Sequence, residues 1–285
     1  MLSYRHGFHA GGFADVHKHV ALTMLLLALQ RKPTPLCFVD SHAGAGSYDL
    51  GSDFAVKNRE FETGITRLWS CKNAPAAVTA YLELIGKVNR VRTGAGQGPR
   101  IYPGSPRIAR LLLRPGDRMV LMELHNSEYP QLKREFKHDR QVTVHHRDAY
   151  EALPGLLPPA ERRGLVLLDP AYELRDEFIR LTETFSAAWR KWPTGVYLIW
   201  YPLQRRQPVP QFLRALKRTG IRRILLNELT VAPDDAPNRL SGSGLVIVNP
   251  PWQFDKEMNE AAQWLAPLLD RGAGVPPRTH WLVPE

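Results

Sequence analysis

Seven short apolar runs, separated by amphipathic segments, constrain the fold of this chain more than any other feature of its sequence. Each run is long enough for a buried strand, and the segments between them have the periodicity of helices. This alternation is typical of a mainly parallel sheet with helices on both faces. The runs are residues 36–40, 118–123, 142–146, 164–169, 195–200, 223–229 and 244–248.

The segments between the runs predict the helices of an α/β fold, a Rossmann-like sheet of seven strands. Helical periodicity over residues 14–29 predicts an opening helix that packs on the sheet. We expect the last two runs to pair as an antiparallel hairpin, because residues 232–243 form a polar connection rather than a helix. The other predicted helices are residues 106–113, 129–136, 149–156, 176–191 and 210–219.

The interval of about 70 residues between the first two runs is too long for a single crossover helix. Within it, residues 60–69 and 75–88 have the pattern of amphipathic helices, and residues 91–100 form a glycine-rich, basic loop. We therefore expect one Rossmann-like domain over residues 1–285, with a small helical insertion subdomain over residues 50–100 beside the active face.

The composition excludes several classes of protein. No apolar run approaches the ~18 residues of a membrane span, and the first residues lack the apolar region of a signal peptide. Two cysteines, Cys37 and Cys71, argue against a disulfide framework and for a reducing compartment. The sequence therefore predicts a cytoplasmic protein with no membrane partner.

A formal net charge of +10 and a pI of about 9.8 favour a nucleic-acid partner. A basic surface raises the affinity for phosphate backbones whatever the sequence that is bound. The alternative is that these cations belong to ordinary solvated helix faces. Basic pairs recur at Arg162-Arg163, Arg205-Arg206, Lys217-Arg218 and Arg222-Arg223.

The tetrapeptide Asp169-Pro170-Ala171-Tyr172 follows an apolar run and predicts chemistry on an exocyclic amine. An acid and a backbone carbonyl can accept the two N–H bonds of an adenine or cytosine amino group, and a tyrosine can stack on the ring. The alternative is a helix-starting turn. A similar tetrapeptide, Asn249-Pro250-Pro251-Trp252, follows the last run, but an antiparallel strand would carry it to the opposite edge of the sheet. We therefore assign the chemistry to Asp169.

The ends of the first three runs predict a cofactor site at the same edge as Asp169. Residues 43–46 form a glycine turn where parallel sheets bind cofactors, and it matches neither the dinucleotide fingerprint nor a phosphate loop. Glu123 is placed to accept hydrogen bonds from ribose hydroxyls, and Asp148 from an adenine amino group. Each acid alone also fits a helix cap. Together, in this order, they are the layout of a methyltransferase that uses S-adenosylmethionine.

Five histidines within the first 42 residues leave a metal-dependent hydrolase open as an alternative. Three of them, His17, His19 and His42, offer with Asp15 and Asp40 the imidazole and carboxylate ligands that divalent ions accept. Their spacing matches no known metal signature, so we predict no metal. A basic RNA-binding protein that never methylates is a further alternative. The histidines are His6, His9, His17, His19 and His42.

Five motifs along the chain carry a resemblance to a known family. They are residues 1–11 (MLSYRHGFHAG), 14–19 (ADVHKH), 40–46 (DSHAGAG), 102–106 (YPGSP) and 249–252 (NPPW). Over essentially the whole length, the chain resembles the bacterial large-subunit ribosomal RNA adenine-N6 methyltransferases of the J type. The resemblance implies a Rossmann-like enzyme that uses S-adenosylmethionine to methylate one adenine of 23S ribosomal RNA, as naked or partly assembled RNA. No obligate protein partner is evident, and we expect a monomer.

The resemblance also implies roles for named residues. Asp169 would be the catalytic acid, in one turn with Pro170 and Tyr172, and Tyr4 would meet the RNA. This chain departs from the family at Ala171, where a second proline is usual, and at Ala149, where a glycine is usual. Ala171 removes the pre-proline restriction on the catalytic turn. The implied cofactor contacts are His19, His42, Ser105, Glu123, Asp148 and Ala149, with the adjacent Lys18.

Overall fold

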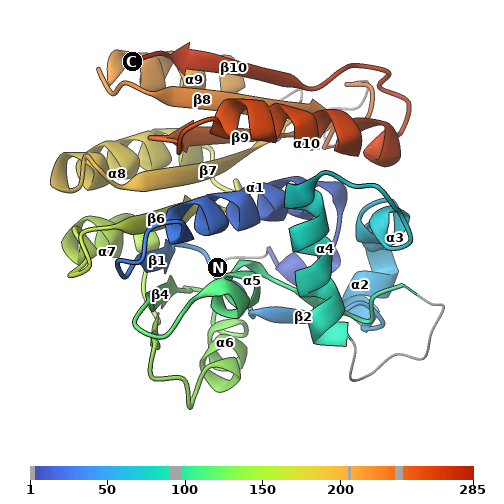
Figure 1. The fold of residues 1–285 in the computed structure, drawn as a ribbon, viewed down its shortest axis with the longest axis horizontal. Helices are drawn as coiled ribbons and strands as arrows, with labels where there is room; N and C mark the ends of the chain where they lie inside the picture. Colours follow the sequence, from blue (N-terminus) through green and yellow to red (C-terminus); the bar gives the residue numbers. More distant parts are fainter. Residues whose placement is uncertain (1–3, 90–97, 205–206, 235–239) are drawn as a thin grey trace.

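An eight-stranded sheet runs through the computed structural model of the chain, which describes residues 4–89, 98–204, 207–234 and 240–285 (Figure 1). The strand order is β10-β8-β9-β7-β6-β1-β4-β5, and the last five strands of that order are parallel. The α/β class with a mainly parallel sheet is therefore confirmed. The parallel strands are β7 (Val196–Leu203), β6 (Gly164–Leu168), β1 (Cys37–Asp40), β4 (Arg118–Met122) and β5 (Val142–His145).

The remaining strands of the sheet are antiparallel to their neighbours. β9 (Gly242–Val248) pairs with both β7 and β8 (Ile224–Thr230), as predicted for the last two runs. All seven predicted strands are present, and the sheet gains an eighth, β10 (Arg278–Val283), on β8. This edge strand was missed because none of its side chains is buried, so it has no apolar alternation.

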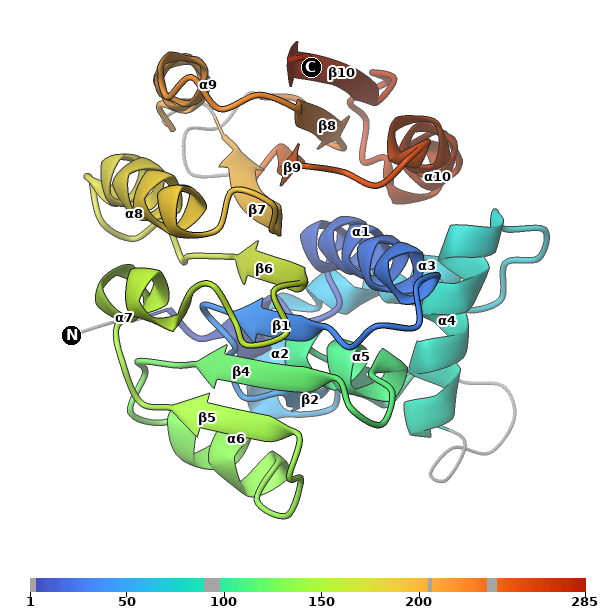
Figure 2. The ribbon, with the colours of Figure 1, turned by 60° about the vertical axis from the view of Figure 1, so that its left-hand side comes forward.

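Helices cover both faces of the sheet (Figures 1 and 2). Successive side chains of a strand point to opposite faces, so Leu165 and Leu167 enter one core while Val166 and Leu168 enter the other. The first core is covered by α1 (Phe13–Gln30), α4 (Ala76–Asn89), α5 (Ser105–Leu112), α6 (Tyr129–Glu135) and α10 (Phe254–Leu269). The second is covered by α7 (Ala149–Leu156), α8 (Glu177–Lys191) and α9 (Val209–Arg218). Of these helices, α10 was not predicted.

The opening helix α1, confirmed by the structure, carries polar residues into the interior. It contacts α4, α5 and α10 as well as β6 and β9, so only its last turn reaches the surface. Asp15 and Lys18 are 3% and 4% exposed. A buried charge is costly unless it is paired. Because α1 is buried, these two side chains need charged or hydrogen-bonding partners, and those partners lie at the candidate site.

A second, two-stranded ladder encloses the predicted insertion. β2 (Ser47–Asp49) pairs antiparallel with β3 (Ile101–Pro103), and α2 (Asp53–Asn58), η2 (Glu60–Glu62), α3 (Ile65–Leu68) and α4 lie between them. The continuous helix predicted over 60–69 is wrong, because Gly64 interrupts it where a Cβ would lie 2.1 Å from the Gly11 carbonyl oxygen. The loop predicted at 91–100 lies largely outside the described residues. That residues 50–100 form a subdomain stays a prediction.

The expectations about membranes and cysteines can be compared with the described part of the chain. Within it, no helix combines the length and apolar content that a membrane crossing requires. Cys37 is buried in β1, Cys71 is partly exposed after α3, and both are free thiols.

Candidate active site

A cavity of about 350 Å³ lies where the parallel strands β1, β4, β6 and β7 end. The carboxyl ends of parallel strands meet at one edge of a sheet, and this brings together residues from distant parts of the chain. Every residue to which the sequence analysis assigned a catalytic, cofactor-binding or RNA-binding role lines this cavity; the individual roles remain predictions. The residues are Tyr4, Lys18, His19, His42, Ser105, Glu123, Asp148, Ala149, Asp169, Pro170 and Tyr172.

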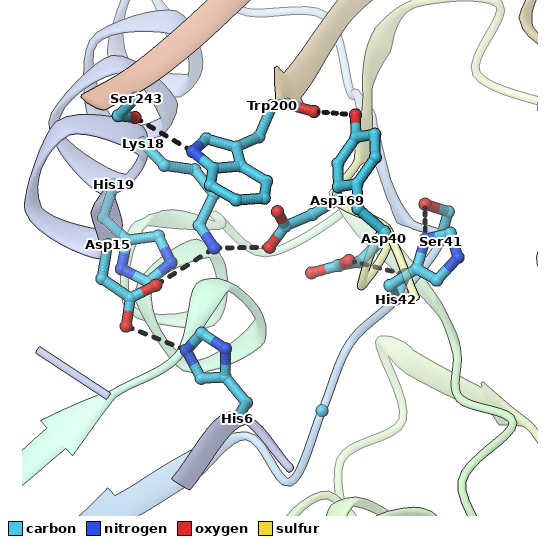
Figure 3. A network of polar contacts seen from close by, with 12 residues as sticks. His6, Asp15, Lys18, His19, Asp40, Ser41, His42, Asp169, Trp200 and Ser243 are labelled. Carbon is cyan, nitrogen blue, oxygen red and sulfur yellow. Dashed lines mark hydrogen bonds and ion pairs between the residues drawn. The ribbon is translucent and has the colours of Figure 1, made fainter. Parts of the chain in front are cut away.

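Asp169 is held by a buried lysine. Lys18 donates from Nζ to Oδ2 of Asp169 and to Oδ1 of Asp15, the latter at 3.1 Å (Figure 3). Burial disfavours the ammonium form, but attraction to the two carboxylates outweighs it and raises the pKa of Lys18. No hydrogen bond from the described residues reaches Oδ1 of Asp169. One carboxylate oxygen is thus fixed and the other is free to accept a hydrogen bond from a ligand.

Asp15 is the centre of this network. Its Oδ2 accepts from His6 Nε2 at 2.8 Å and from the Gly11 amide at 3.0 Å, and Tyr4 Oη lies 3.0 Å from His6 Nδ1. Burial opposes both charges, yet the mutual attraction raises the pKa of His6 and, together with Lys18, lowers that of Asp15. The network therefore links Tyr4 through His6, Asp15 and Lys18 to Asp169. The sequence analysis had placed Asp15 only in a possible metal cluster and had assigned no role to His6.

His17, another member of that possible cluster, is occupied elsewhere. Its Nδ1 lies 2.8 Å from Ser243 Oγ and its Nε2 lies 2.6 Å from Asn227 Oδ1. Burial lowers the pKa of His17 to about 4. The part of the chain that the structure describes contains no group of three or more His, Cys, Asp or Glu side chains placed to hold a metal.

Tyr172 is packed more tightly than the sequence suggested. Its hydroxyl donates to the Trp200 carbonyl oxygen at 2.5 Å, and its ring lies 4.6 Å from that of Phe178 between centroids. Only 9% of Tyr172 is exposed, so only the part of the ring at the cavity can meet a base.

Trp200, on β7, is a cavity residue that the sequence reasoning missed. Its indole donates from Nε1 to Ser243 Oγ at 2.9 Å, and Lys18 Nζ lies 5.9 Å from the ring centroid. Trp200 is the last residue of the predicted strand 195–200. The rule that cofactor edges lie at the carboxyl ends of strands could therefore have found it.

The glycine turn after β1 is fastened to Glu123. The Gly44 amide donates to Glu123 Oε2 at 2.7 Å, and the His125 amide donates to Oε1 at 2.6 Å. Gly44 has a φ of +61°, and a Cβ there would lie 2.2 Å from Tyr48 Oη, so the turn requires glycine. Burial raises the pKa of Glu123 despite these two bonds.

Behind this turn, Asp40 is fully buried. Its Oδ2 finds no hydrogen-bond partner among the described residues, and burial raises its pKa to about 7. Nearby, His42 Nδ1 lies 2.6 Å from Ser41 Oγ, and His19 Nδ1 lies 2.8 Å from Tyr102 Oη. Burial lowers the pKa of His42 to about 4 and that of His19 to about 3. Both imidazoles are therefore neutral at pH 7.

Asp148 takes the first of the two roles weighed for it, that of a helix cap, while its role as an acceptor for an adenine amino group stays a prediction. It caps α7, because Oδ1 accepts from the Tyr150 amide at 2.8 Å, and Oδ2 pairs with Arg180 at 3.1 Å. It also lines the cavity, next to Ala149. The cap positions the start of α7 at the cavity wall.

The second tetrapeptide lies at the other edge of the sheet. β9 is antiparallel to β7, and its last residue, Val248, pairs with Tyr197 near the start of that strand. The Asn249 amide donates to the carbonyl oxygens of Pro193 and Gly195, both at 2.8 Å. The expectation that an antiparallel strand removes Asn249 from the cavity edge is confirmed.

Comparison with known proteins gives consistent likenesses over the full length. A family model described as "Ribosomal RNA large subunit methyltransferase D, RlmJ" matches residues 33–283. A protein of Escherichia coli K12 named ribosomal RNA large subunit methyltransferase J is 42% identical over 286 aligned positions, which cover 100% of both chains. The protein of the same name from Haemophilus influenzae is 41% identical with the same coverage. The crystal structure of a Legionella pneumophila protein superposes with a TM-score of 0.84 at 34% identity, covering 95% of this chain and 97% of that one.

Proposed function

The chain belongs to the ribosomal RNA large subunit methyltransferase J family, and from this premise we propose that it methylates the N6 amino group of one adenine in 23S ribosomal RNA, with S-adenosylmethionine as the methyl donor. The observation that carries the proposal is the free Oδ1 of Asp169, which faces a cavity bordered by the glycine turn of β1. An acceptor for an amino group and a cradle for a cofactor thus share one enclosed space.

The residues around the glycine turn suit S-adenosylmethionine. Glu123, fixed by two backbone amides, presents a carboxylate to ribose hydroxyls. The neutral imidazoles of His19 and His42 line the cavity beside the turn and offer polar atoms to the amino-acid part. When bound, this cofactor supplies a methyl group on a positively charged sulfonium.

Recognition of the amino group would fall to Asp169 and Pro170. The free Oδ1 and the Pro170 carbonyl oxygen accept its two hydrogens, which directs the nitrogen lone pair away from both acceptors and into the cavity. Lys18 holds Oδ2, so the carboxylate keeps one orientation. The adenine has to leave its stack to reach this position.

Asp169 also provides a place for the proton. An amino nitrogen that gains a methyl group carries a positive charge until one of its protons leaves, and Oδ1 is the nearest acceptor in the proposed pose. Lys18, with its raised pKa, stays an ammonium and does not compete for that proton.

Tyr4 and the two histidines near it suit contact with the RNA. The rings of Tyr4 and His9 stack at 5.4 Å between centroids, with an interplanar angle of 5°. Stacked rings are a common platform for unpaired bases. The base itself would meet the cavity side of Tyr172. We place the reaction in the cytoplasm, where ribosomal RNA is assembled and where two free thiols remain reduced.

The experiment that tests the proposal is transfer of labelled methyl groups to ribosomal RNA that lacks the modification. We expect the label on adenine N6 and calorimetric binding of S-adenosylmethionine at one site per chain. An RNA-binding protein without catalysis would bind RNA but would neither transfer the label to adenine nor bind S-adenosylmethionine. A hydrolase would instead degrade a substrate and lose that activity on chelation.

A further inference from the structure

The basic pairs noted in the sequence do not mark the mouth of the cavity. Three of the pairs precede the amino ends of β6 and β8, at the edge of the sheet opposite the cavity, and they are Arg162-Arg163, Lys217-Arg218 and Arg222-Arg223. The pair Arg205-Arg206 lies outside the described residues. The polar groups inside the cavity are therefore a more specific guide to what binds there.

Glu128 is a buried acid whose side chain has no partner among the described residues. It is 8% exposed and lines the cavity, but neither of its carboxyl oxygens takes part in a hydrogen bond or an ion pair with that part of the chain. Glu128 also stands at the N-cap of α6, where its side chain makes no capping bond. A buried polar group without a partner is costly. The side chain is therefore placed to accept a hydrogen bond from a ligand in the cavity.

Tyr48, on β2, has a hydroxyl proton without an acceptor. Its oxygen accepts from the Ala45 amide at 3.0 Å, and within the described ranges no group accepts a hydrogen bond from it. Tyr48 is buried and lines the cavity as well. Burial raises the pKa of Tyr48, and repulsion from Glu128 adds to the rise. The hydroxyl therefore stays protonated and can donate to a ligand.

Both groups lie at the glycine turn that Glu123 holds. A Cβ on Gly44 would lie 2.2 Å from Tyr48 Oη and 3.3 Å from Glu128 Oε2, so both atoms are close to the bare backbone of Gly44. The Gly44 amide also donates to Glu123 Oε2 at 2.7 Å. Glu123, Glu128 and Tyr48 thus meet at one residue of the turn.

We propose that Glu128 and Tyr48 bind one hydroxyl group of the cofactor's ribose, next to Glu123. This inference rests on the proposed function, since it requires S-adenosylmethionine in the cavity. A hydroxyl group both donates and accepts, so it can donate to Glu128 and accept from Tyr48. An ammonium group only donates, and it would leave the Tyr48 proton without an acceptor.

A ribose also suits the presence of two acids at this turn. Each carboxyl oxygen of Glu123 already accepts a backbone amide, whereas both oxygens of Glu128 are free of such bonds. The two acids are close, because Glu128 adds to the effect of burial in raising the pKa of Glu123. The 2′- and 3′-hydroxyls of a ribose are adjacent, so each acid can accept from one of them.

The test is calorimetric binding of S-adenosylhomocysteine and of its 2′-deoxy and 3′-deoxy forms. This ligand carries the ribose of the cofactor but no methyl group to transfer, so binding is measured without turnover. The first variant is Glu128→Met, which removes both acceptor atoms at similar size, and the second is Tyr48→Phe, which removes the donor. The matched control is Glu135→Met, on the same helix but exposed and away from the cavity.

In the parent, loss of either hydroxyl should weaken binding about tenfold. In Glu128→Met, the complete ligand should bind about tenfold more weakly, and removal of one of the two hydroxyls should cause no further loss. Tyr48→Phe should single out the same hydroxyl, and Glu135→Met should match the parent for all three ligands. The free Glu128→Met protein should unfold at no lower urea concentration than the parent, because the variant removes a buried group without a partner.

A second arm separates the cofactor from the target nucleotide, which also carries a 2′-hydroxyl. RNA with 2′-deoxyadenosine at the methylated position should be disfavoured equally by the parent and by Glu128→Met. If the variant instead lost this discrimination and bound every form of the cofactor ligand as the parent does, the hydroxyl would belong to the RNA and the proposal would be overturned.

Two further outcomes would overturn the proposal. One is that both deoxy forms lose the same affinity in Glu128→Met as in the parent, because neither hydroxyl would then depend on Glu128. The other is that Tyr48→Phe singles out a different hydroxyl from Glu128→Met. Failure of the proposed function is distinguishable, because the parent would then bind neither S-adenosylmethionine nor S-adenosylhomocysteine.

Discussion

Two turns of similar sequence occupy opposite edges of the sheet. Asp169-Pro170-Ala171-Tyr172 follows β6, and Asn249-Pro250-Pro251-Trp252 follows β9. Both contain a residue with a φ of +54°, Tyr172 in the first and Asn249 in the second. The first turn lines the cavity, while the second lies beside the amino ends of β7 and β8. Strand direction, rather than the tetrapeptide, decides which one can meet a cofactor.

The two turns also use their polar side chains differently. The side-chain amide of Asn249 donates to the carbonyl oxygens of Pro193 and Gly195, so its hydrogen bonds hold the turn in place within the protein. Asp169 has one oxygen fixed by Lys18 and the other without a partner from the described residues. The aromatic residues differ in the same sense, since Tyr172 is 9% exposed and Trp252 is 82% exposed. A preorganised acceptor in an enclosed site, and not the motif, distinguishes the turn proposed to be catalytic from the structural one.

The largest expected difference between the turns is in methyl transfer. Asp169→Ala should lower the rate by about 10²–10⁴-fold, because it removes the acceptor of the amino hydrogens, while Trp252→Ala should keep the parent's rate. Labelled-methyl transfer measures both, with calorimetry of S-adenosylmethionine as the folding control. Near-normal transfer by Asp169→Ala would refute the assignment.

The next difference concerns the lysines beside the turns. Lys18→Met leaves Asp15 and Asp169 buried without their cation, so we expect a loss of about 3–5 kcal/mol in the free energy of unfolding at pH 7. The loss should shrink at acid pH, where protonation of the Asp15 carboxyl group removes its charge. Lys256→Met, an exposed lysine beside Trp252, should stay within about 0.5 kcal/mol. Urea unfolding at both pH values checks this, and equal effects would contradict the comparison.

The pH dependence of stability should report the hydrogen-bond network behind the Asp169 turn. His17 accepts from Ser243, which in turn accepts from Trp200, and its pKa falls from about 6.5 to about 4 on folding. A lowered folded-state pKa means that stability present above pH 6.5 is lost as the pH falls toward 4, about 2 kcal/mol by pH 5. His17→Asn should therefore reduce the pH slope of the unfolding free energy by about one proton. Trp252→Ala, which removes no titrating group, should keep the slope of the parent, and a parent without acid destabilisation in this window would exclude the effect.

The smallest expected difference is in the aromatic residues. Tyr172→Phe removes the donor to the Trp200 carbonyl oxygen and should cost about 1–1.5 kcal/mol in the free energy of unfolding. Trp252→Phe, on an exposed ring, should change it by less than about 0.5 kcal/mol. Chemical denaturation at pH 7 measures both, and the same result for the two variants would mean that the Tyr172 bond contributes nothing.

Local patterns in the sequence were sufficient for most of the sheet. Buried strands such as β1 and β6 consist of apolar residues in unbroken runs, and glycine, acidic and proline residues mark where they end. The same patterns did not predict elements whose position or extent depends on tertiary contacts. β10 has no buried side chain to reveal it, and the helix predicted over 60–69 breaks because Gly64 packs against the backbone of Gly11 and Gly12.

The candidate site also combines residues that could be predicted from the sequence with contacts that could not. Glu123, Asp148 and Asp169 could be predicted because each stands at or next to the end of an apolar run, and parallel strands bring such ends to one edge. Trp200 ends a predicted run as well, so the same rule could have found it as a cavity residue. Its closeness to Lys18 comes from the packing of α1 against the sheet.

The sequence alone determined where seven of the eight strands of the main sheet lie along the chain, which acids stand at their ends and, through its motifs, the resemblance to a methyltransferase family. The tertiary structure decided which of the two tetrapeptides reaches the cavity, and it placed Lys18 against Asp169 across 151 positions of sequence. The physical reason is that periodicity and turn chemistry act between neighbouring residues. Strand direction, burial of a charge and the pairing it demands arise only when distant segments pack together.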